Sequence, residues 1–270
     1  MTRLTYCLNA STIMTTPIMR QIDVAAEAGY GAIELWHDHI DAYLEQGGSV
    51  ADIRKAVDDR GLQVPTTIYL AGWFESEGQQ HQAALDECKR RMANSAEIGA
   101  PYIIAGPPGE AADYDRGAAH YRELLEIGAT MGVKPAMEFL GFVDQLNTIE
   151  DALDVMTRAR HADVSTVLDP FHIFRGGGSL ESISLLSAGQ IAISHYNDVP
   201  AEPARELQHD KDRVMPGDGE FDLARYIELL LATGYDRQLS LELFREDLWQ
   251  QDPLEVAVKG LDKMRQTVEG

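Results

Sequence analysis

The amino-acid sequence predicts an α/β protein folded as a (β/α)8 TIM barrel, in a single domain that spans residues 1–270. Short apolar runs rich in β-branched residues alternate with longer amphipathic stretches along the whole chain. There are eight such units, spaced by roughly 30 residues, as expected for one strand and one helix each. No linker or compositional break divides them. Eight continuous units favour a closed barrel, with an open doubly wound sheet as the alternative.

The expected strands are the short apolar runs, at residues 4–8, 32–36, 64–69, 102–105, 133–138, 164–169, 191–197 and 238–243. The expected helices are the amphipathic stretches, at residues 17–28, 50–60, 82–98, 118–131, 149–159, 180–186, 223–233 and 253–268. Several of these helices are followed by a glycine just before the next strand, which is typical of a helix C-terminus. These glycines are Gly29, Gly61, Gly99, Gly132 and Gly234.

The charge balance limits the classes of partner. The chain carries 44 acidic and 23 basic residues, a formal net charge of −21, beside a hydrophobic content of 44% that is enough for a sizeable core. A negative field of this size repels nucleic acid and anionic membranes, which bind clustered Lys and Arg. We therefore expect neither nucleic acid nor a membrane as a partner, and a small molecule instead.

The lack of a recognisable targeting signal predicts a cytoplasmic protein. The first residues lack the basic, apolar and small-residue pattern of a secretory signal, and no stretch approaches the roughly 18 apolar residues of a membrane span. The two cysteines, Cys7 and Cys88, show no metal-ligand spacing and are expected to be buried thiols. The number of subunits stays open, and a homo-oligomer is possible.

One connection is longer than the others. Residues 197–221 follow the seventh expected strand and are rich in Pro, Gly and charged residues. Loops of this length in a compact domain are usually functional. We expect this loop to cover the C-terminal face of the barrel, where active sites of this fold lie; a passive surface loop is the alternative.

Potential metal ligands stand at or near the ends of the fifth to eighth expected strands. They are Glu138, Asp169, His195 and Glu242. The C-terminal ends of barrel strands converge, although each residue taken alone is also compatible with a turn or a helix cap. Three carboxylates buried together are costly unless a cation or protons compensate them, so their convergence predicts a divalent metal ion. This oxygen-rich set suits Mn²⁺, the expected ion, or Mg²⁺, tolerates Co²⁺ and can capture Zn²⁺.

Four further residues are candidates for the walls of the site. His172, in LDPFHIF, is expected above the metal within reach of a substrate hydroxyl, or else packs at a helix start. Trp36 would be an apolar platform for the substrate. Glu34, inside the second strand, is either a substrate contact or a buried ion-pair partner, and Arg245 either reaches a substrate oxygen or pairs with a nearby acid.

Several segments resemble the xylose isomerase-like sugar isomerase/epimerase family: MEFLGF, LDPFHIFRGGGSLESI, HYND followed by DRVMPGDGEFDL, and LSLELFRED. The resemblance runs in order over about residues 134–264, whereas the first half matches mainly in its βα rhythm and in AIELW. Within the family it is nearest to enzymes that isomerise an inosose, 2-keto-myo-inositol. Met215 and Asp218 depart from that pattern, which has an aromatic residue and an amide there, so the substrate stays open.

The resemblance implies roles for matching residues. The implied metal ligands are Glu138, Asp169, His195 and Glu242. The two glutamates are implied to move protons from opposite sides of the substrate, and His172 and Arg213 to contact its oxygens. The resemblance thus implies an isomerase or epimerase of carbohydrate metabolism, such as inositol catabolism, acting on a small polyhydroxylated ketone.

The ligand set leaves the outcome of the reaction open. A metal that binds a ketone oxygen and a neighbouring hydroxyl stabilises the enediolate formed when a proton leaves the adjacent carbon. Returning the proton to the neighbouring carbon gives isomerisation, and returning it to the opposite face of the same carbon gives epimerisation. Loss of a β-hydroxyl gives dehydration. The alternatives are therefore a ketose 3-epimerase and a dehydratase of a keto-polyol or 3-dehydroshikimate. More distant are a non-catalytic sugar-binding protein and an endonuclease IV-like nuclease, which the net charge disfavours.

Overall fold

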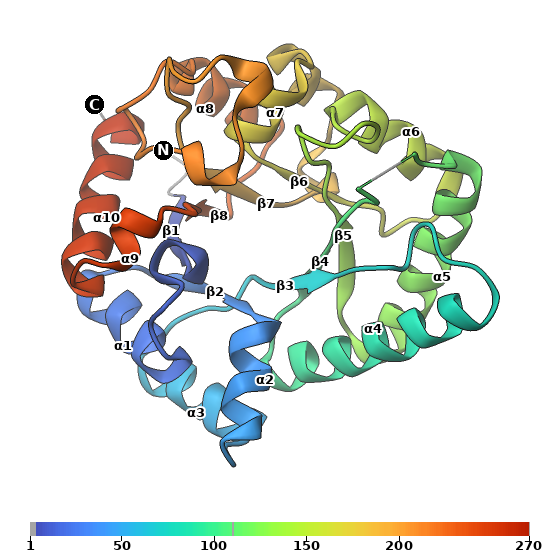
Figure 1. Ribbon diagram of the computed structural model, residues 1–270, viewed down its shortest axis with the longest axis horizontal. Helices are drawn as coiled ribbons and strands as arrows, with labels where there is room; N and C mark the ends of the chain where they lie inside the picture. The colour runs from blue at the N-terminus through green and yellow to red at the C-terminus, as the bar shows by residue number, and fades with distance from the viewer. Residues whose placement is uncertain (1–3, 110, 270) are drawn as a thin grey trace.

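The strands form a closed barrel in the computed structural model, which describes residues 4–109 and 111–269. Eight parallel strands follow one another around it in sequence order, and β1 (Thr5–Asn9) closes the ring by pairing with β8 (Gln238–Leu241) as well as β2 (Ala32–Trp36). Helices surround the strands on all sides (Figure 1). The predicted (β/α)8 barrel is confirmed, and the open sheet is excluded. Both bounds of the predicted domain, residues 1 and 270, lie outside the described residues.

The remaining strands overlap the predicted runs. They are β3 (Thr66–Leu70), β4 (Tyr102–Ala105), β5 (Lys134–Met137), β6 (Thr166–Leu168) and β7 (Ile191–Tyr196). Four of the predicted runs, those for β5 to β8, extended one or two residues too far at their C-terminal ends. Glu138, Asp169 and Glu242 each stand one residue beyond the last residue of a strand, at the mouth of the barrel.

The helices match most of the predicted amphipathic stretches. The α-helices are α1 (Ile18–Ala28), α2 (His37–Glu45), α3 (Val50–Asp59), α4 (Gly78–Ile98), α5 (Tyr114–Met131), α6 (Ile149–Ala159), α7 (Pro170–Gly176), α8 (Leu223–Ala232), α9 (Glu246–Trp249) and α10 (Pro253–Glu269). Short 3-10 turns are η1 (Ala10–Ile13), η2 (Leu180–Leu185), η3 (Ala188–Gln190), η4 (Arg205–Leu207) and η5 (Asp210–Asp212). The glycines predicted to end helices all have a positive φ: Gly29, Gly61, Gly99, Gly132 and Gly234.

The sixth βα unit differs from the prediction. The expected helix at 180–186 is the 3-10 turn η2, and the α-helix of this unit is the short α7, which begins directly after β6. Its start is specified locally: the Asp169 side chain accepts a hydrogen bond from the Phe171 N–H at 2.8 Å, and Pro170 occupies the first helical position. Gly177 then ends the helix with a φ of 75°.

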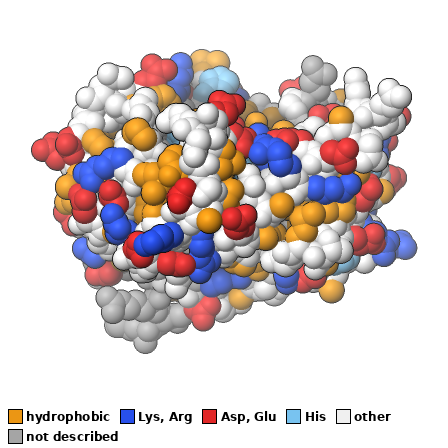
Figure 2. All heavy atoms as spheres, turned by 90° about the horizontal axis from the view of Figure 1, so that it is seen from below, with side chains coloured by type: hydrophobic (Ala, Val, Ile, Leu, Met, Phe, Trp, Pro, Cys, Tyr) orange, Lys and Arg blue, Asp and Glu red, His pale blue; other side chains and the backbone are white. Residues whose placement is uncertain are grey.

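The core has two parts. A small cluster inside the barrel contains Ile68, Ile104, Ala136, Val167, Ala192 and Ile193. A much larger one fills the layer between the strands and the helices. The surface carries interspersed acidic and basic side chains on the side of the barrel that Figure 2 shows. None of the helices in the described parts of the chain combines the length and apolar character of a membrane span.

The long loop at 197–221 is tied down by one buried carboxylate. Asp198 accepts hydrogen bonds at 2.8 to 3.0 Å from the backbone N–H groups of Val199, Gly217, Gly219 and Phe221. The backbone of Gly219 passes so close that a Cβ there would lie 2.4 Å from Asp198 Oδ1. An antiparallel bridge also joins Asp198 to Val214 in the loop's return segment. These contacts hold the loop against the C-terminal ends of the strands.

We predict that Asp198→Asn destabilises the fold by about 2–3 kcal/mol, because the amide nitrogen would face backbone donors that the carboxylate now satisfies. Urea denaturation followed by circular dichroism measures the loss. Asp218→Asn in the same loop makes the same chemical change at an exposed pair with Lys263 and should cost under about 1 kcal/mol. Equal effects of the two substitutions would contradict the anchoring role of Asp198.

Candidate metal centre

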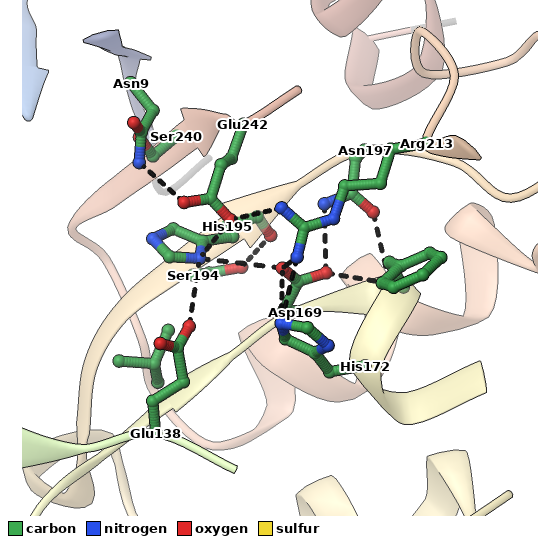
Figure 3. A network of polar contacts seen from close by, with 12 residues as sticks. Asn9, Glu138, Asp169, His172, Ser194, His195, Asn197, Arg213, Ser240 and Glu242 are labelled. Carbon is green, nitrogen blue, oxygen red and sulfur yellow. Dashed lines mark hydrogen bonds and ion pairs between the residues drawn. The ribbon is translucent and has the colours of Figure 1, made fainter. Parts of the chain in front are cut away.

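The predicted metal ligands converge at the C-terminal mouth of the barrel (Figure 3). Asp169, His195 and Glu242 are buried, and each offers a ligand atom within 4.8 Å of those of the other two. Glu138 approaches from the opposite side of the imidazole, its Oε1 3.7 Å from His195 Nδ1. Its side chain is 13% exposed, to the cavity at the mouth. Four residues distant in the sequence thus surround one point.

Two buried atoms at this point, His195 Nδ1 and Asp169 Oδ2, lie 3.6 Å apart and form no hydrogen bond among the described residues, although Asp169 Oδ2 has an Arg213 nitrogen 3.0 Å away as an ion-pair partner. Glu242 Oε2 is 3.0 Å from the same nitrogen. Buried polar atoms are normally satisfied, so such a pair calls for an explanation. One imidazole nitrogen and several carboxylate oxygens facing one another make a donor set that fits a divalent cation.

Electrostatics gives a second reason for a cation. Burial raises the pKa of Glu138 to about 8 against the attraction of His195, and the nearby Glu242 and Asp169 add to the rise. Burial acts to lower the pKa of His195, but Glu242 and the other carboxylates raise it well above its usual value. Without a metal, the cluster therefore holds extra protons. A divalent ion would replace them with fixed charge.

Arg213 supplies the other positive charge. This fully buried residue comes from the long loop; one terminal nitrogen lies 2.7 Å from Glu242 Oε2 and the other 3.0 Å from Asp169 Oδ2. The guanidinium is placed between two aromatic rings, 4.9 Å from the centroid of Phe171 and 5.0 Å from that of Phe244. Arg213 thus orients the two carboxylates from the loop side.

His172, on the first turn of α7, lies beside this arginine. Its Nε2 is 2.9 Å from an Arg213 terminal nitrogen, and its Nδ1 is 3.2 Å from the Gly141 N–H. Burial lowers the pKa of His172 to about 4, although Asp169 opposes this effect. The imidazole is therefore neutral near pH 7. It can exchange one of these contacts for a hydroxyl group of a ligand.

Above the centre lies a cavity of about 450 Å³. One wall is largely apolar and includes Trp36, Ile68, Tyr69, Leu140, Phe142 and Phe244. Polar side chains line the rest: Glu75, Glu138, His172, Asp210, Arg213 and Glu242. Among the described lining residues Arg213 is the one lysine or arginine, and its charge is already engaged by carboxylates. The cavity therefore suits an uncharged polar molecule with one apolar face.

The structure brings most of the predicted substrate contacts to this cavity. Trp36, His172 and Arg213 line it. Arg245 does not: it pairs with Asp247 at 2.7 and 2.8 Å and lines separate hollows on the outer surface. Of the two possibilities open for Arg245, pairing with a nearby acid is the one observed.

The two positions that depart from the family pattern are also outside the cavity lining. Met215 is buried, and Asp218 forms a surface pair with Lys263. They therefore have less bearing on substrate choice than their place in the long loop suggested.

Three further residues contact the ligands, and two of them were not predicted from the sequence. The Asn9 Nδ2 group donates to Glu242 Oε1 at 3.0 Å and to Glu34 Oε2 at 3.1 Å. Asn197 donates from Nδ2 to Asp169 Oδ1 at 2.9 Å. Asn9 ends β1 and Asn197 follows β7. This position at the C-terminal end of a strand was the sequence signal that could have identified both asparagines as site residues. Glu34 is fully buried and faces His195, as the ion-pair alternative anticipated.

Fold and site together define the class. The sequence profile of the xylose isomerase-like TIM barrel family matches residues 22–267, and the chain belongs to this family. Among its relatives, the inosose isomerase of Bacillus velezensis is 27% identical over 254 residues, 90% of either chain. The 3-dehydroshikimate dehydratase of Pseudomonas aeruginosa is 26% identical over 265 residues, 93% of this chain but only 40% of that larger protein.

Solved structures show the same fold. The IOLI protein with a binding zinc atom superposes with a TM-score of 0.92 at 24% identity, covering 98% of each chain. A D-psicose 3-epimerase crystallised in the presence of D-fructose gives a TM-score of 0.76 at 20% identity, covering 99% of this chain and all of that one.

We predict that Asp169→Asn weakens Zn²⁺ and Mn²⁺ binding by at least about 100-fold, more than the loss typical of residues that only support a ligand. Asparagine remains a good N-cap, so α7 should persist and the loss should be specific to the metal. Chelator competition gives the affinity. Asp163→Asn, at an exposed pair with Lys134, is the matched control. Unchanged affinity in Asp169→Asn would contradict the assigned ligand.

Proposed function

We propose that the protein is a divalent-metal-dependent isomerase of an uncharged polyhydroxylated ketone, with activity on an inosose such as 2-keto-myo-inositol. The observation that carries this proposal is the buried Asp169, His195 and Glu242 group, with Glu138 facing it, on the floor of a cavity that has one largely apolar wall. Curated inosose isomerases, 25 to 27% identical over 90% of this chain, support the reaction class.

The residues that would hold the metal are Glu138, Asp169, His195 and Glu242. We propose Mn²⁺ as the resident ion, because oxygen ligands outnumber the single imidazole; the zinc atom in the similar IOLI structure makes Zn²⁺ the other candidate. When bound, the ion supplies Lewis-acid stabilisation for the oxygen charge that develops as a carbon-bound proton leaves.

The two glutamates differ in a way that assigns their roles. The Glu138 carboxylate accepts no hydrogen bond from the described residues and faces the cavity, so it is free to take a proton from a substrate carbon. Glu242 is held by Asn9 and Arg213, which fixes its carboxylate on the other side of the site. We propose that Glu138 removes the proton and that Glu242 delivers or relays one.

Other residues would orient the substrate. Trp36 and Phe244 meet edge to face at 5.6 Å between ring centroids and offer the apolar face of a sugar ring a surface to lie on. His172 and Arg213 present nitrogen donors to substrate oxygens at the opposite wall. The long loop closes this side and excludes water, which strengthens the electrostatic interactions inside.

Dehydration of 3-dehydroshikimate is the second candidate, supported by the Pseudomonas aeruginosa relative. The cavity charge favours the isomerase over it. Dehydroshikimate carries a carboxylate, and the described lining residues offer Arg213 as the only lysine or arginine beside the acidic Glu75, Glu138, Asp210 and Glu242. Glu75 and Asp210 lie outside the proposed ligand set, so their repulsion of an anion would remain with the ion bound. The same argument disfavours a phosphorylated sugar.

The reaction is tested by incubating the Mn²⁺-loaded enzyme in D₂O with 2-keto-myo-inositol, D-fructose, D-psicose and 3-dehydroshikimate. We expect NMR to show deuterium entering the inosose beside its carbonyl group, together with a new inosose isomer. Conversion of dehydroshikimate into an aromatic dihydroxybenzoate, seen as new aromatic proton signals, would support the dehydratase instead. Exchange and inversion at one carbon of a ketose would indicate an epimerase. No exchange with any compound would refute proton transfer.

The role of Glu138 is tested by Glu138→Gln. We expect turnover to fall by about 10²–10⁴-fold, the usual contribution of a general base, because the amide cannot accept the proton. Turnover is measured at saturating Mn²⁺, because Glu138 is also a proposed ligand and the substitution is expected to weaken metal binding. Glu97→Gln, on an exposed face of α4, is the control for the same chemical change. Retention of wild-type turnover in Glu138→Gln would assign the base elsewhere.

A further inference from the structure

Glu34 is a buried carboxylate that the proposed reaction does not use. It lies in β2 with no exposed surface, directly below the metal centre. Four donors surround it, each from a different strand: His195 Nε2 on β7, Asn9 Nδ2 on β1, Thr66 Oγ1 on β3 and Ser240 Oγ on β8. No lysine or arginine in the described chain pairs with it. Among the described residues, His195 is the one side chain that forms an ion pair with it.

The geometry divides the two nitrogens of His195 between two environments. Nε2 lies 3.3 Å from Glu34 Oε2 and 3.4 Å from Oε1, whereas Nδ1 points at the metal-ligand oxygens of Glu242 and Asp169, 3.0 and 3.6 Å away. A metal needs a lone pair on the nitrogen that binds it. The other nitrogen must then carry the proton of the neutral ring and find an acceptor.

We infer that Glu34 is a positioning residue for the metal centre: it accepts the Nε2–H of His195 and thereby presents the Nδ1 lone pair to the ion. This inference rests on the proposed metal-dependent function. Carboxylates that accept from the second nitrogen of a ligating histidine fix its tautomer and ring orientation, and they make it a stronger ligand. Glu34 fits this role because it is buried beside His195 and its Oε2 lies 3.3 Å from His195 Nε2.

Glu34 also acts on a second ligand. Asn9 donates from the same Nδ2 group to Glu34 Oε2 and to Glu242 Oε1, so the amide links the two carboxylates. The Asn9 Oδ1 atom in turn accepts from the Trp36 indole N–H at 2.8 Å. One buried carboxylate thus orients His195 directly and Glu242 through Asn9. Trp36, on the cavity wall, is tied into the same network.

A purely structural role would leave part of this arrangement unexplained. An isolated buried carboxylate is costly, and the hydroxyl groups of Thr66 and Ser240 would be satisfied as well by neutral acceptors. A charge at this position becomes favourable when the imidazole above it carries positive charge from a proton or a metal. Negative charge below His195 and a cation above it are complementary.

The first test uses the wild-type protein loaded with Zn²⁺. Nitrogen-15 NMR of the histidine side chains should show one imidazole with an unprotonated, metal-bound Nδ1. Its Nε2 should carry a slowly exchanging, strongly downfield proton, the signature of a buried N–H donated to a carboxylate. A protonated Nδ1 with Nε2 bound to zinc would overturn the inference, as would a rapidly exchanging Nε2 proton.

The second test compares variants by zinc affinity, measured by chelator competition. Glu34→Met removes the acceptor at similar volume and should weaken zinc binding by about 10–100-fold. Glu34→Gln keeps an acceptor oxygen without the charge and should fall between that variant and the wild type. Thr67→Val, an equally buried site in β3 that contacts Ser95 instead of the centre, should bind zinc like the wild type.

Affinity in Glu34→Met within about twofold of the wild-type value would overturn the inference, as would an equal loss in Thr67→Val. If Glu34→Met does not fold, the test uses the solvent-exchange rate of the His195 Nε2 proton in zinc-loaded Glu34→Gln. We expect this proton to exchange faster than in the wild type. An unchanged rate would contradict the positioning role of Glu34. None of these measurements requires turnover. Zinc binding without activity on any ketone would therefore refute the proposed function alone, whereas a wild-type protein that binds no zinc would refute both.

Discussion

The burial of several carboxylates around one imidazole is the constraint on which the rest of the site depends. Asp169, Glu242, Glu138 and Glu34 all approach His195, in a region largely removed from water. Their mutual repulsion and lost hydration would disrupt the mouth of the barrel unless positive charge compensated them. Arg213 supplies part of that charge, and the raised pKa values of Glu138 and His195 favour further positive charge at the same point. A divalent ion bound among these carboxylates would complete the balance.

The barrel makes this concentration of charge possible. Parallel strands bring residues that are distant in sequence to one ring, and hydrogen bonds from neighbouring strands can then hold each carboxylate in place. Asn9 and Asn197 hold Glu242 and Asp169 in this way. The long loop adds Arg213 from above and is itself fixed by Asp198, so the charge balance inside the cavity depends on the fold of a surface segment. The side chains of the centre are therefore held both by the strands and by the long loop.

The elements predicted well were those whose signals are local. Amphipathic helices ended by glycine, such as α1 and α4, and apolar strands such as β2 and β4 repeat a period that the side chains themselves carry. The helices α2 and α7 were not expected. Helix α2 has no capping side chain at its start, and α7 lasts only seven residues before a run of glycines. Tertiary packing against the strands stabilises such short helices, and propensity alone does not reveal it.

The sequence by itself determined the barrel, and the four candidate ligands, because the C-terminal ends of consecutive parallel strands must meet whatever the packing details. The tertiary structure decided the rest. Arg245 pairs with its neighbour Asp247 at the surface, while Arg213 is drawn inside, and no periodicity distinguishes the two arginines. The role of Glu34 depends on contacts with four residues that the barrel brings together from four strands: Asn9, Thr66, His195 and Ser240. A hydrogen-bond network depends on distances in space, and sequence separation does not encode them.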